Sequence, residues 1–453
     1  MRPLRTNLRI GKGKEQGVII TLVAVFMLFV VGAMAALSID VVTIYTARSE
    51  AQLAADSAAL AAARVLANSG ATSDPNAVAD GLMATAWTLA TAVALQVAEQ
   101  NQVGGANLTS SQITIPATAP LSVTNPTVNV KIQVNLPTFF ARIWGSTQVA
   151  VAASATAEAY NPSATSGVSS GGTRPLVAPL CVKPWLLPNM SPGETGATSA
   201  QIFDPMTGAI LDTGLLGWAT PSVGPTHLRN VCTTPYNTDC TGISPALGPP
   251  PTAWRYYPGT SDPTTGSFPA PSASSVTCSG CTGFDNYQLS IAGCVQTPVA
   301  CNATVSVDQT SETSPTARDV ETADPVNDMT HATASKGDRV DISVDTPPPF
   351  QFLAGDDNPI PGTKGYDVMV SDSLVTVPVI NVDSVSGLPP TYPTVQIIGF
   401  LQLFLNPNGT FSPASGHIRT QVINLAGCGT TASGTPIVGN GASPVVVRLI
   451  SGS

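Results

Sequence analysis

The sequence contains few charged residues and almost no histidine. Charged side chains make up 10% of the 453 residues, and the three histidines, His227, His331 and His417, lie far apart. Histidine metal ligands usually occur in closely spaced groups, so this distribution favours loop residues over a metal site. The net charge of −9 argues against binding to nucleic acid, because surfaces that hold phosphates are basic.

Nucleotide-binding motifs are also missing. The chain has no Walker loop and no dinucleotide-binding fingerprint. The aspartates at 324–328 and 356–357 offer oxygen atoms that Ca²⁺ prefers, but neither group has the spacing of a calcium loop, and turn formation explains both. These absences predict a protein that is not an enzyme and that uses no cofactor or metal.

One long apolar stretch stands out among the features that are present. Val18–Ile39 contains 22 residues without a charge. As a helix rising about 1.5 Å per residue it would extend roughly 33 Å, enough to cross the hydrocarbon core of a membrane. The alternative is a signal peptide cleaved near Ala33-Met34-Ala35, but such peptides have a shorter apolar core. We therefore predict an uncleaved transmembrane helix at 18–39.

The charges on either side of this helix predict its orientation. Residues 1–17 hold five basic residues and one acid, a net charge of +4, so the rest of the chain carries −13. Basic flanks stay in the cytoplasm, so residues 1–17 should be a cytoplasmic segment and the chain from Asp40 onward should be exported. This predicts a single-pass membrane protein with its N-terminus inside the cell and its bulk exported.

Residues 40–160 have the pattern of a small α+β unit. Alanine-rich helical sequence continues to Asn68, and Asp74-Pro75 predicts the start of a second helix that runs to about Gln102. Strict alternation predicts strands at 127–136 and 148–160, joined by a short connection at 137–144. The expected fold is therefore a helical hairpin packed on a small sheet.

The remaining residues are rich in Gly, Pro, Ser and Thr. A flexible linker is expected at 161–173, and a Pro/Gly-rich insertion near 241–275. Residues 174–453 should form a β-rich exported region, either a sandwich or an irregular barrel, and no long helix is expected in residues 180–453. Strands are predicted at Tyr366–Val370, Leu374–Val382, Val395–Leu405, Ile418–Asn424 and Val445–Ile450.

All eight cysteines follow the apolar stretch, and an even number in an exported region predicts disulfides. The Cys278-x-x-Cys281 spacing also occurs at zinc and redox sites, but disulfides are the better interpretation outside the cytoplasm. Eight cysteines allow 105 pairings, and only a local bridge between Cys232 and Cys240 is favoured. The candidate disulfide cysteines are Cys181, Cys232, Cys240, Cys278, Cys281, Cys294, Cys301 and Cys428.

The N-terminal part resembles the TadE/TadG-like family of tight-adherence (Flp) pilus assembly, in its TadG-like branch. The resemblance covers residues 11–65 well and extends more loosely to 160. It includes the basic start, the apolar run, and the strands joined by Phe139–Gly145. The residues that carry it are Gly17, Asp40, Ala47-Arg48, Gln52, Ala54-Ala55-Asp56 and Ala58-Ala59-Leu60-Ala61.

Two departures from family patterns limit what the resemblance implies. Related pilins carry Glu five residues after the cleaved Gly, whereas this chain has Leu22 after Gly17, so cleavage and polymerisation into a fibre are not expected. Many TadG-like proteins end in a von Willebrand A domain with an Asp-x-Ser-x-Ser metal loop. Here Asp341–Asp345 ends in Asp instead of Ser, and we expect a strand there.

The resemblance implies a structural role in pilus assembly or secretion. It also implies that the protein is anchored in a bacterial inner (cytoplasmic) membrane, with its bulk in the periplasm or outside the cell. The partners would be other Tad/Flp assembly proteins or pilus subunits, contacted outside that membrane. Asp40, Gln52 and Asp56 are candidate helix-packing residues, although Asp40 could simply mark the bilayer exit and Asp56 could face water. The alternative function is a membrane-tethered surface adhesin or binding module, which long Ser/Thr/Gly/Pro loops would also suit.

Overall fold

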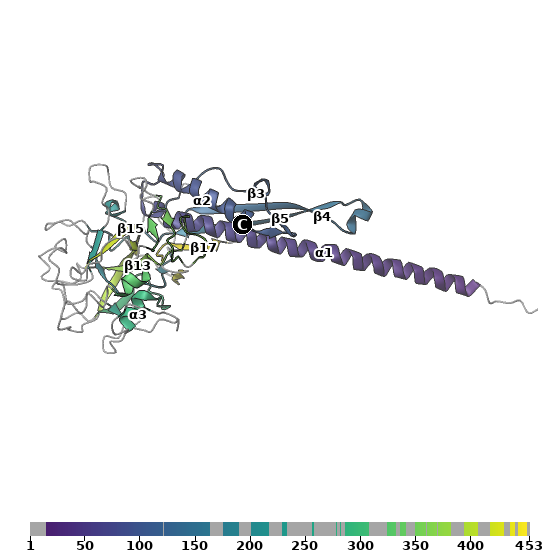
Figure 1. Cartoon of the computed structure of the whole chain (residues 1–453). Coiled ribbons are helices and arrows are strands. Elements are labelled where there is room, and N and C mark those ends of the chain that lie inside the picture. The colour runs from purple at the N-terminus through teal and green to yellow at the C-terminus, as the bar shows by residue number, and fades with distance from the viewer. Residues whose placement is uncertain are drawn as a thin grey trace, which may run out of the picture.

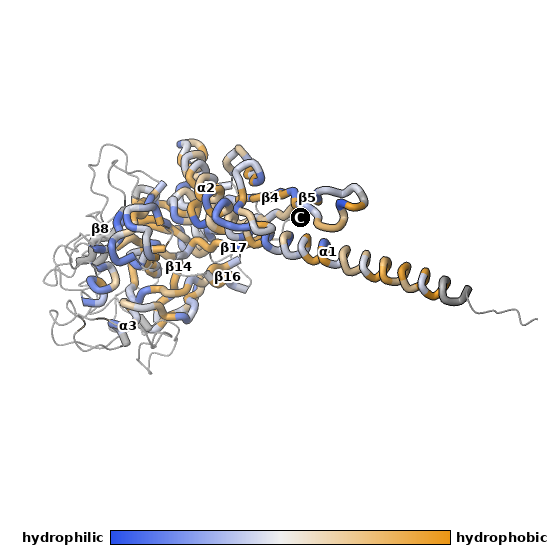
Figure 2. The backbone as a smooth tube through the Cα atoms, turned by 45° about the vertical axis from the view of Figure 1, so that its right-hand side comes forward, coloured by the Kyte–Doolittle hydropathy of each residue, from blue (hydrophilic) through white to orange (hydrophobic). Residues whose placement is uncertain are grey.

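A single long helix, α1 (Glu15–Asn68), extends out of the body of the protein in a computed structural model of the chain (Figure 1). Its first half projects away from the rest of the protein, and its second half is packed against it. The most apolar 18-residue window has a mean hydropathy of 2.7 and buries none of its residues. Figure 2 shows this projecting half as apolar along most of its length. The sequence prediction of a long apolar N-terminal helix is confirmed.

The structure describes residues 15–120, 122–163, 175–189, 201–216, 229–232, 256–257, 278, 281, 286–307, 324–331, 336–340, 349–358, 360–368, 370–381, 394–405, 417–429, 435–439 and 443–450. Several expectations fall wholly or largely outside these residues. They are the linker at 161–173, the insertion at 241–275, the strand at Asp341–Asp345 and the bridge between Cys232 and Cys240.

The second half of α1 buries a face made almost entirely of alanine. This face packs on strands β4 (Thr127–Pro137) and β5 (Gln148–Tyr160) and on helix α2 (Leu82–Glu99), which lies alongside α1. Small side chains allow the backbones of these elements to approach closely, and the contact is built from many short-range packing interactions. The fully buried alanines of α1 are Ala51, Ala54, Ala55, Ala58, Ala59, Ala62, Ala63 and Ala67.

Helix α2 begins at Leu82 and not at Pro75, so the predicted start is wrong. The Asp74 carboxylate accepts the N–H of Asn76 at 2.8 Å, which forms a local turn instead of a helix cap. Gly81 then adopts a left-handed conformation with φ of 78°, directly before the helix. A short 3-10 helix, η1 (Ala71–Ser73), precedes these turns. α2 also has the length and hydropathy of a membrane span, but its Leu82, Ala86 and Ala90 are buried in the protein core.

A four-stranded antiparallel sheet lies against these helices, in the order β17-β5-β4-β3. The strands are β3 (Ile113–Thr114), β4 (Thr127–Pro137), β5 (Gln148–Tyr160) and β17 (Val446–Ile450). In β4, Val128, Val130 and Ile132 are fully buried while Lys131 and Gln133 are exposed, as the alternation predicted. Strand β17 comes from the far end of the sequence and pairs with β5, with Arg448 opposite Glu158. A small hairpin of β1 (Gln102–Val103) and β2 (Ala106–Asn107) follows α2, and η2 (Ser110–Gln112) leads into β3.

A second, larger sheet forms the C-terminal body. Its path is β7-β13-β14-β10-β9, and β15 pairs with both β14 and β8. Every residue of β13 is buried, because apolar clusters cover both faces of the sheet. The elements are β7 (Leu187–Pro188), β8 (Arg229–Cys232), β9 (Tyr256–Tyr257), β10 (Thr304–Val307), β13 (Leu374–Ile380), β14 (Thr394–Leu405) and β15 (His417–Gly427), with the short helix α3 (Asn286–Ala292) nearby. The prediction of an α+β fold with a β-rich C-terminal region is confirmed.

The strand prediction at Tyr366–Val370 is wrong. Among its described residues only Asp367 forms an isolated bridge, to Leu353. The Asp367 carboxylate also accepts the N–H of Phe352, at 3.0 Å, so this segment is a loop that supports a neighbouring strand. That strand, β12 (Phe352–Leu353), pairs with β11 (Arg339–Val340), and a second small pair joins β6 (Val177–Ala178) to β16 (Ile437–Val438). The remaining described elements are η3 (Ala141–Trp144) and η4 (Thr213–Leu215).

Three disulfides connect described cysteines: Cys181–Cys294, Cys278–Cys281 and Cys301–Cys428. The first and third join segments that are 113 and 127 residues apart in the sequence. The Cys-x-x-Cys pair is bridged to itself. The sequence prediction of disulfides is therefore confirmed for these six cysteines.

A buried polar network joins the end of α1 to the C-terminal body. Asn424 on β15 donates to the carbonyl of Ala67 and to the Oε1 atom of Gln402. Its side-chain oxygen accepts the Ser73 hydroxyl at 3.1 Å. Asn161, just after β5, donates to the carbonyls of Thr72 and Leu425 at 3.0 and 2.9 Å. Because these groups are away from water, the hydrogen bonds to Ala67, Ser73 and Leu425 fix the N-terminal unit in position on the C-terminal body.

Candidate functional site

The candidate site lies where the β4–β5 hairpin meets α1. The hairpin runs back along the helix toward its N-terminus, and its tip reaches further in that direction than the rest of the body (Figure 1). The tip consists of residues 138–147 and includes η3. Asp40 of α1 lies at the level of this tip and was one of the three candidate packing residues.

Asp40 binds the tip through its carboxylate. One oxygen, Oδ1, accepts the N–H of Phe139 at 2.9 Å, and the other, Oδ2, accepts those of Phe140 and Ala141 at 3.0 and 2.7 Å. These N–H groups stand at the start of η3, where backbone donors have no partner within the helical turn. Asp40 therefore acts as an N-cap supplied by a different element, and only 3% of its surface is exposed.

These contacts also determine the protonation state of Asp40. Burial opposes the charged form, but the hydrogen bonds from Ala141, Phe139 and Phe140 and the positive charge of Arg142 outweigh it. The pKa of Asp40 is consequently below its ordinary value. Asp40 is thus a carboxylate at neutral pH whose oxygens are occupied by backbone donors, an arrangement that holds two elements together.

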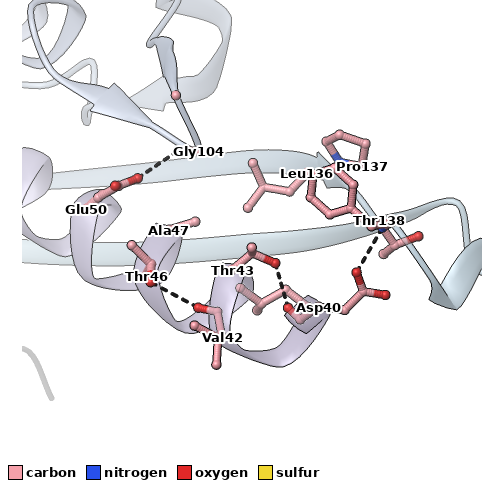
Figure 3. A pocket seen from close by; sticks show the side chains of 13 residues that line it. Asp40, Val42, Thr43, Thr46, Ala47, Glu50, Gly104, Leu136, Pro137 and Thr138 are labelled. Atoms are coloured by element: carbon pink, nitrogen blue, oxygen red, sulfur yellow. Dashed lines mark hydrogen bonds between the residues drawn. The ribbon is translucent and has the colours of Figure 1, made fainter. Parts of the chain in front are cut away.

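A cavity of about 330 Å³ lies beside Asp40, between α1 and the hairpin (Figure 3). Thr43 and Ala47 line its helix side, and Leu136 and Thr138 line its strand side. At the end away from Asp40, Glu50 accepts the N–H of Gly104 at 2.7 Å. Gly104 has φ of 62°, a backbone conformation that favours glycine, and a Cβ there would lie 2.5 Å from the end of the Leu136 side chain.

Gln52 and Asp56 lie further along α1, and Gln52 joins Asp56 to the β4–β5 hairpin. The Gln52 amide donates to Asp56 Oδ1 at 2.8 Å and to the carbonyl of Ser154 on β5 at 3.1 Å. All three candidate residues thus lie along the hairpin side of α1. The sequence did not indicate Glu50, or the backbone donors of Phe139–Ala141, as their neighbours. The Phe139–Gly145 connection was part of the family resemblance, and this resemblance was the signal in the sequence that could have pointed to these donors.

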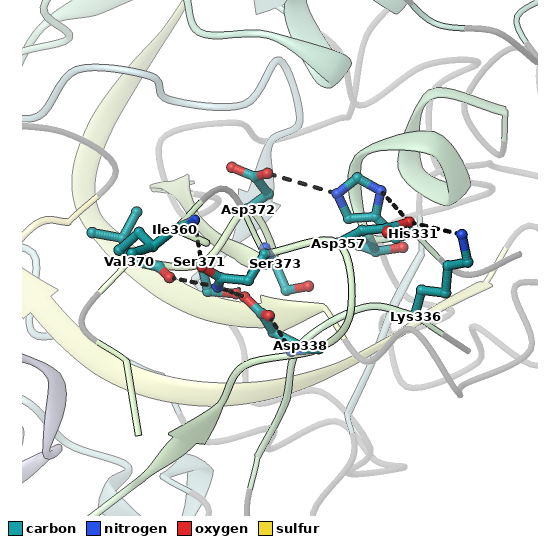
Figure 4. Close-up of polar contacts among 12 residues, drawn as sticks. His331, Lys336, Asp338, Asp357, Ile360, Val370, Ser371, Asp372 and Ser373 are labelled. Atoms are coloured by element: carbon teal, nitrogen blue, oxygen red, sulfur yellow. Dashed lines mark hydrogen bonds and ion pairs between the residues drawn. The ribbon is translucent and has the colours of Figure 1, made fainter. Parts of the chain in front are cut away.

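A second group of charged side chains lies in the C-terminal body (Figure 4). His331 Nδ1 lies 4.0 Å from Asp357 and His331 Nε2 lies 3.8 Å from Asp372, while Lys336 approaches Asp357 at 3.5 Å. These side chains are partly exposed, so their pairing contributes little to stability. The turn that holds them is set by buried Asp338, which accepts the Gly355 N–H at 2.7 Å. Within the described part of the chain, no three His, Cys, Asp or Glu side chains are placed to hold a metal.

Lys183 is a buried cation close to this group. Its ammonium donates to the carbonyls of Ile291 and Gly293 at the C-terminal end of α3. Such carbonyls lack partners within the helix and carry partial negative charge. Burial lowers the pKa of Lys183 to about 8, although the charge of Asp372 opposes that shift.

The lowered pKa of Lys183 predicts that stability increases with pH. Between pH 8 and 10.5 the unfolded state holds a proton on this lysine that the folded state has released, so raising the pH favours folding. Relative to a Lys183→Met variant, the wild-type protein should gain roughly 3 kcal/mol across this range. Denaturant unfolding of both proteins at several pH values measures the gain. A difference that does not change with pH would contradict a buried, titrating Lys183.

The fold defines a class of protein: an α+β protein with an N-terminal apolar helix of membrane-spanning length and a disulfide-bonded, β-rich body. Residues 17–65 match the family described as putative Flp pilus-assembly TadE/G-like, which confirms the resemblance of this segment. The matched segment contains Asp40, Gln52 and Asp56, and it forms most of α1. Neither the curated proteins nor the solved structures include a significant match to the chain.

Proposed function

We propose that this protein is a membrane-anchored structural component of Flp (Tad) pilus assembly or secretion. It acts by protein–protein contacts outside the inner membrane, with other assembly proteins or with pilus subunits. The observation that carries the proposal is the family match at 17–65, which falls on the helix whose most apolar 18-residue window buries none of its residues. An exposed apolar helix of this length is stable only if lipid or another protein covers it.

Charge and disulfides support the proposed orientation. The basic residues of segment 1–17 favour a cytoplasmic N-terminus by the positive-inside rule. The three disulfides of the body favour an oxidising compartment on the other side of the membrane. Both features support a single-pass arrangement, in which segment 1–17 and the body lie on opposite sides of the membrane.

The surface of α1 that faces away from the sheet is the proposed contact surface for a partner. Leu53 lies in the matched segment, beyond the apolar half, and is 66% exposed although it is a large apolar residue. It is next to Gln52 in the sequence and one helical turn from the half-buried Asp56. An exposed leucine on an otherwise alanine-rich helix is suited to a pocket on an assembly protein or a pilus subunit.

Replacing Leu53 by Asp should reduce both co-purification with Tad assembly proteins and the number of surface pili, by about tenfold. A charge placed in a desolvated contact is costly, while the fold is preserved because this side chain is exposed. A strain that lacks the gene is complemented with each variant, and sheared pili are quantified by immunoblot. Met206→Asp, at a 72% exposed apolar residue in the C-terminal body, is the matched control.

The same experiment separates the assembly role from the alternative role, a membrane-tethered surface adhesin. Loss of pili with Leu53→Asp, but not with Met206→Asp, supports the assembly role. Normal pili and normal complexes with Leu53→Asp would contradict a role for this helix surface in assembly. A strain that lacks the whole gene, has normal pili and no longer adheres would instead favour the surface adhesin.

A further inference from the structure

We propose that the tip of the β4–β5 hairpin rests in the head-group layer of the membrane that holds α1. In this arrangement Phe139 and Ile143 contact lipid directly. The inference rests on the membrane anchoring included in the proposed function and adds a second point of contact with the same bilayer. Its evidence is the attachment of the tip at Asp40, the apolar side chains exposed there, and the distribution of charge along α1.

The tip is fixed beside the membrane-spanning part of α1. The hydrogen bonds from Phe139, Phe140 and Ala141 to Asp40 hold it at the residue that follows the predicted span, 18–39. Because the side chain of Asp40 is short, the tip cannot move away from the helix without breaking these bonds. Any membrane that surrounds residues 18–39 therefore ends close to the tip.

Apolar side chains are exposed at this level on both elements. On the tip, Phe139 is 57% exposed and Ile143 is 72% exposed. On α1, Val42 and Tyr45 are also exposed, one turn apart. The rest of the hairpin has its apolar side chains turned toward the core, as Val128, Val130 and Ile132 show. Exposed aromatic and branched apolar residues at one level are typical of the interface between a membrane and water.

The charge distribution along α1 places the edge of the membrane near the tip. The only charged residue of the helix between Glu15 and Arg48 is Asp40, and its carboxylate is covered by the tip. The stretch between Glu15 and Arg48 extends over about 48 Å at the helical rise, more than the roughly 30 Å of hydrocarbon and about the full thickness of a bilayer with its head groups. The head-group layer on the exported side thus coincides with Val42, Tyr45 and the tip.

The chemistry of the tip fits the head-group layer better than the hydrocarbon core. Arg142 is exposed, and its Nε atom donates to the carbonyl of Thr138 at 2.9 Å. The guanidinium has four further N–H donors, which suit the phosphate groups of lipids. The backbone of an open turn, in contrast, needs water or polar groups as partners and is not tolerated in hydrocarbon. Phe139 and Ile143 would therefore enter only the boundary between head groups and acyl chains.

Two contacts with one membrane would fix the orientation of the body. A single helix allows a protein to rotate about the helix axis and to tilt. A second contact on one side of the helix removes much of this freedom, because rotation would lift Phe139 and Ile143 out of the lipid. The contact surface around Leu53 would then face a constant direction relative to the membrane plane.

Photo-crosslinking in a bilayer tests this inference. A diazirine-bearing amino acid is placed at Ile143, Phe139, Leu28 or Met206 of the full-length protein, which is reconstituted in nanodiscs of phosphatidylethanolamine and phosphatidylglycerol. All four side chains are exposed, so the replacements leave the core intact. Leu28 in the apolar half reports anchoring, and Met206 in the C-terminal body is the control. Lipid adducts at Ile143 and Phe139 should exceed those at Met206 by about tenfold.

The outcomes test the membrane anchor and the lipid contact of the tip separately. Adducts at Leu28 without adducts at Ile143 or Phe139 would overturn the inference and leave the anchor in place. An absence of adducts at Leu28 would overturn the anchor, and with it the inference. Equal amounts of adduct at Met206 and Ile143 would show non-specific contact and would also overturn the inference. The same holds if the tip crosslinks to a protein partner in native membranes and forms no lipid adduct.

Discussion

Replacing Cys301 and Cys428 together by alanine is expected to lower the free energy of unfolding of the C-terminal body by about 2–5 kcal/mol. The bridge closes a segment of 127 residues, and a loop of this size loses much conformational entropy when it is closed. Both cysteines are buried, and both segments lie against the same part of β14. The N–H of Asn302, next to Cys301, donates to the carbonyl of Ile397 at 3.0 Å, and the N–H of Cys428 donates to the carbonyl of Ile398 at 2.8 Å. The bridge thus joins two segments on either side of that strand.

Thermal unfolding in detergent, followed by circular dichroism, measures this effect. The expected decrease in melting temperature is about 5–15 °C. The double replacement of Cys278 and Cys281 is the control, because that bridge separates its cysteines by only 3 positions and closes a very short loop. By the same loop-closure argument its loss should cost about 2 kcal/mol or less. Equal effects of the two replacements would contradict the argument from loop size.

Replacing Asn424 by alanine is expected to cost about 3 kcal/mol and to weaken the attachment of α1 to the C-terminal body. The Asn424 side chain is fully buried and is the centre of the polar network. Without it, the carbonyl of Ala67 and the side chain of Gln402 lose a donor, and Ser73 loses an acceptor. Buried groups without partners are more costly than the hydrogen bonds themselves.

Hydrogen exchange distinguishes this effect from a general loss of stability. Amides in the last turns of α1 and in β15 should exchange faster in Asn424→Ala, while those in the middle of β4 should change less. Asn129→Ala is a matched control, because Asn129 is only partly buried and donates to Ala155 and Thr156 within its own sheet. Its expected cost is about 1 kcal/mol. Similar exchange patterns for both variants would contradict a joining role for Asn424.

The parts of the fold that local patterns encode were predictable. Twenty-two uncharged residues indicate the apolar half of α1, and alternating valines indicate β4, because burial on one face imposes a period of two on a strand. Strands β13, β14 and β15 were predictable from apolar runs. The start of α2 was not, because Asp74 is equally suited to cap a helix or to form the turn that it forms with Asn76.

The contacts between distant segments could not be predicted from one sequence. Nothing in Val446–Ile450 indicates that this strand pairs with β5 and not with its neighbours in sequence. The three disulfides are similarly undetermined, since spacing does not specify pairing. At the candidate site, Asp40 was identifiable as an isolated charge next to an apolar run. Its partners are backbone N–H groups about 100 residues away, and backbone groups leave no mark in the sequence.

The pairing of β17 with β5 has a consequence for the order of folding. Glu158 and Arg448, which face each other across these strands, are separated by 290 residues. During synthesis the edge of β5 therefore stays unpaired until most of the polypeptide has been made. Until then its N–H and C=O groups can form hydrogen bonds with a strand of another chain. A chaperone that covers this edge, or a rapid supply of the later residues, would protect the nascent protein from aggregation. A truncated product without β17 would keep the edge permanently open to strand exchange with other chains.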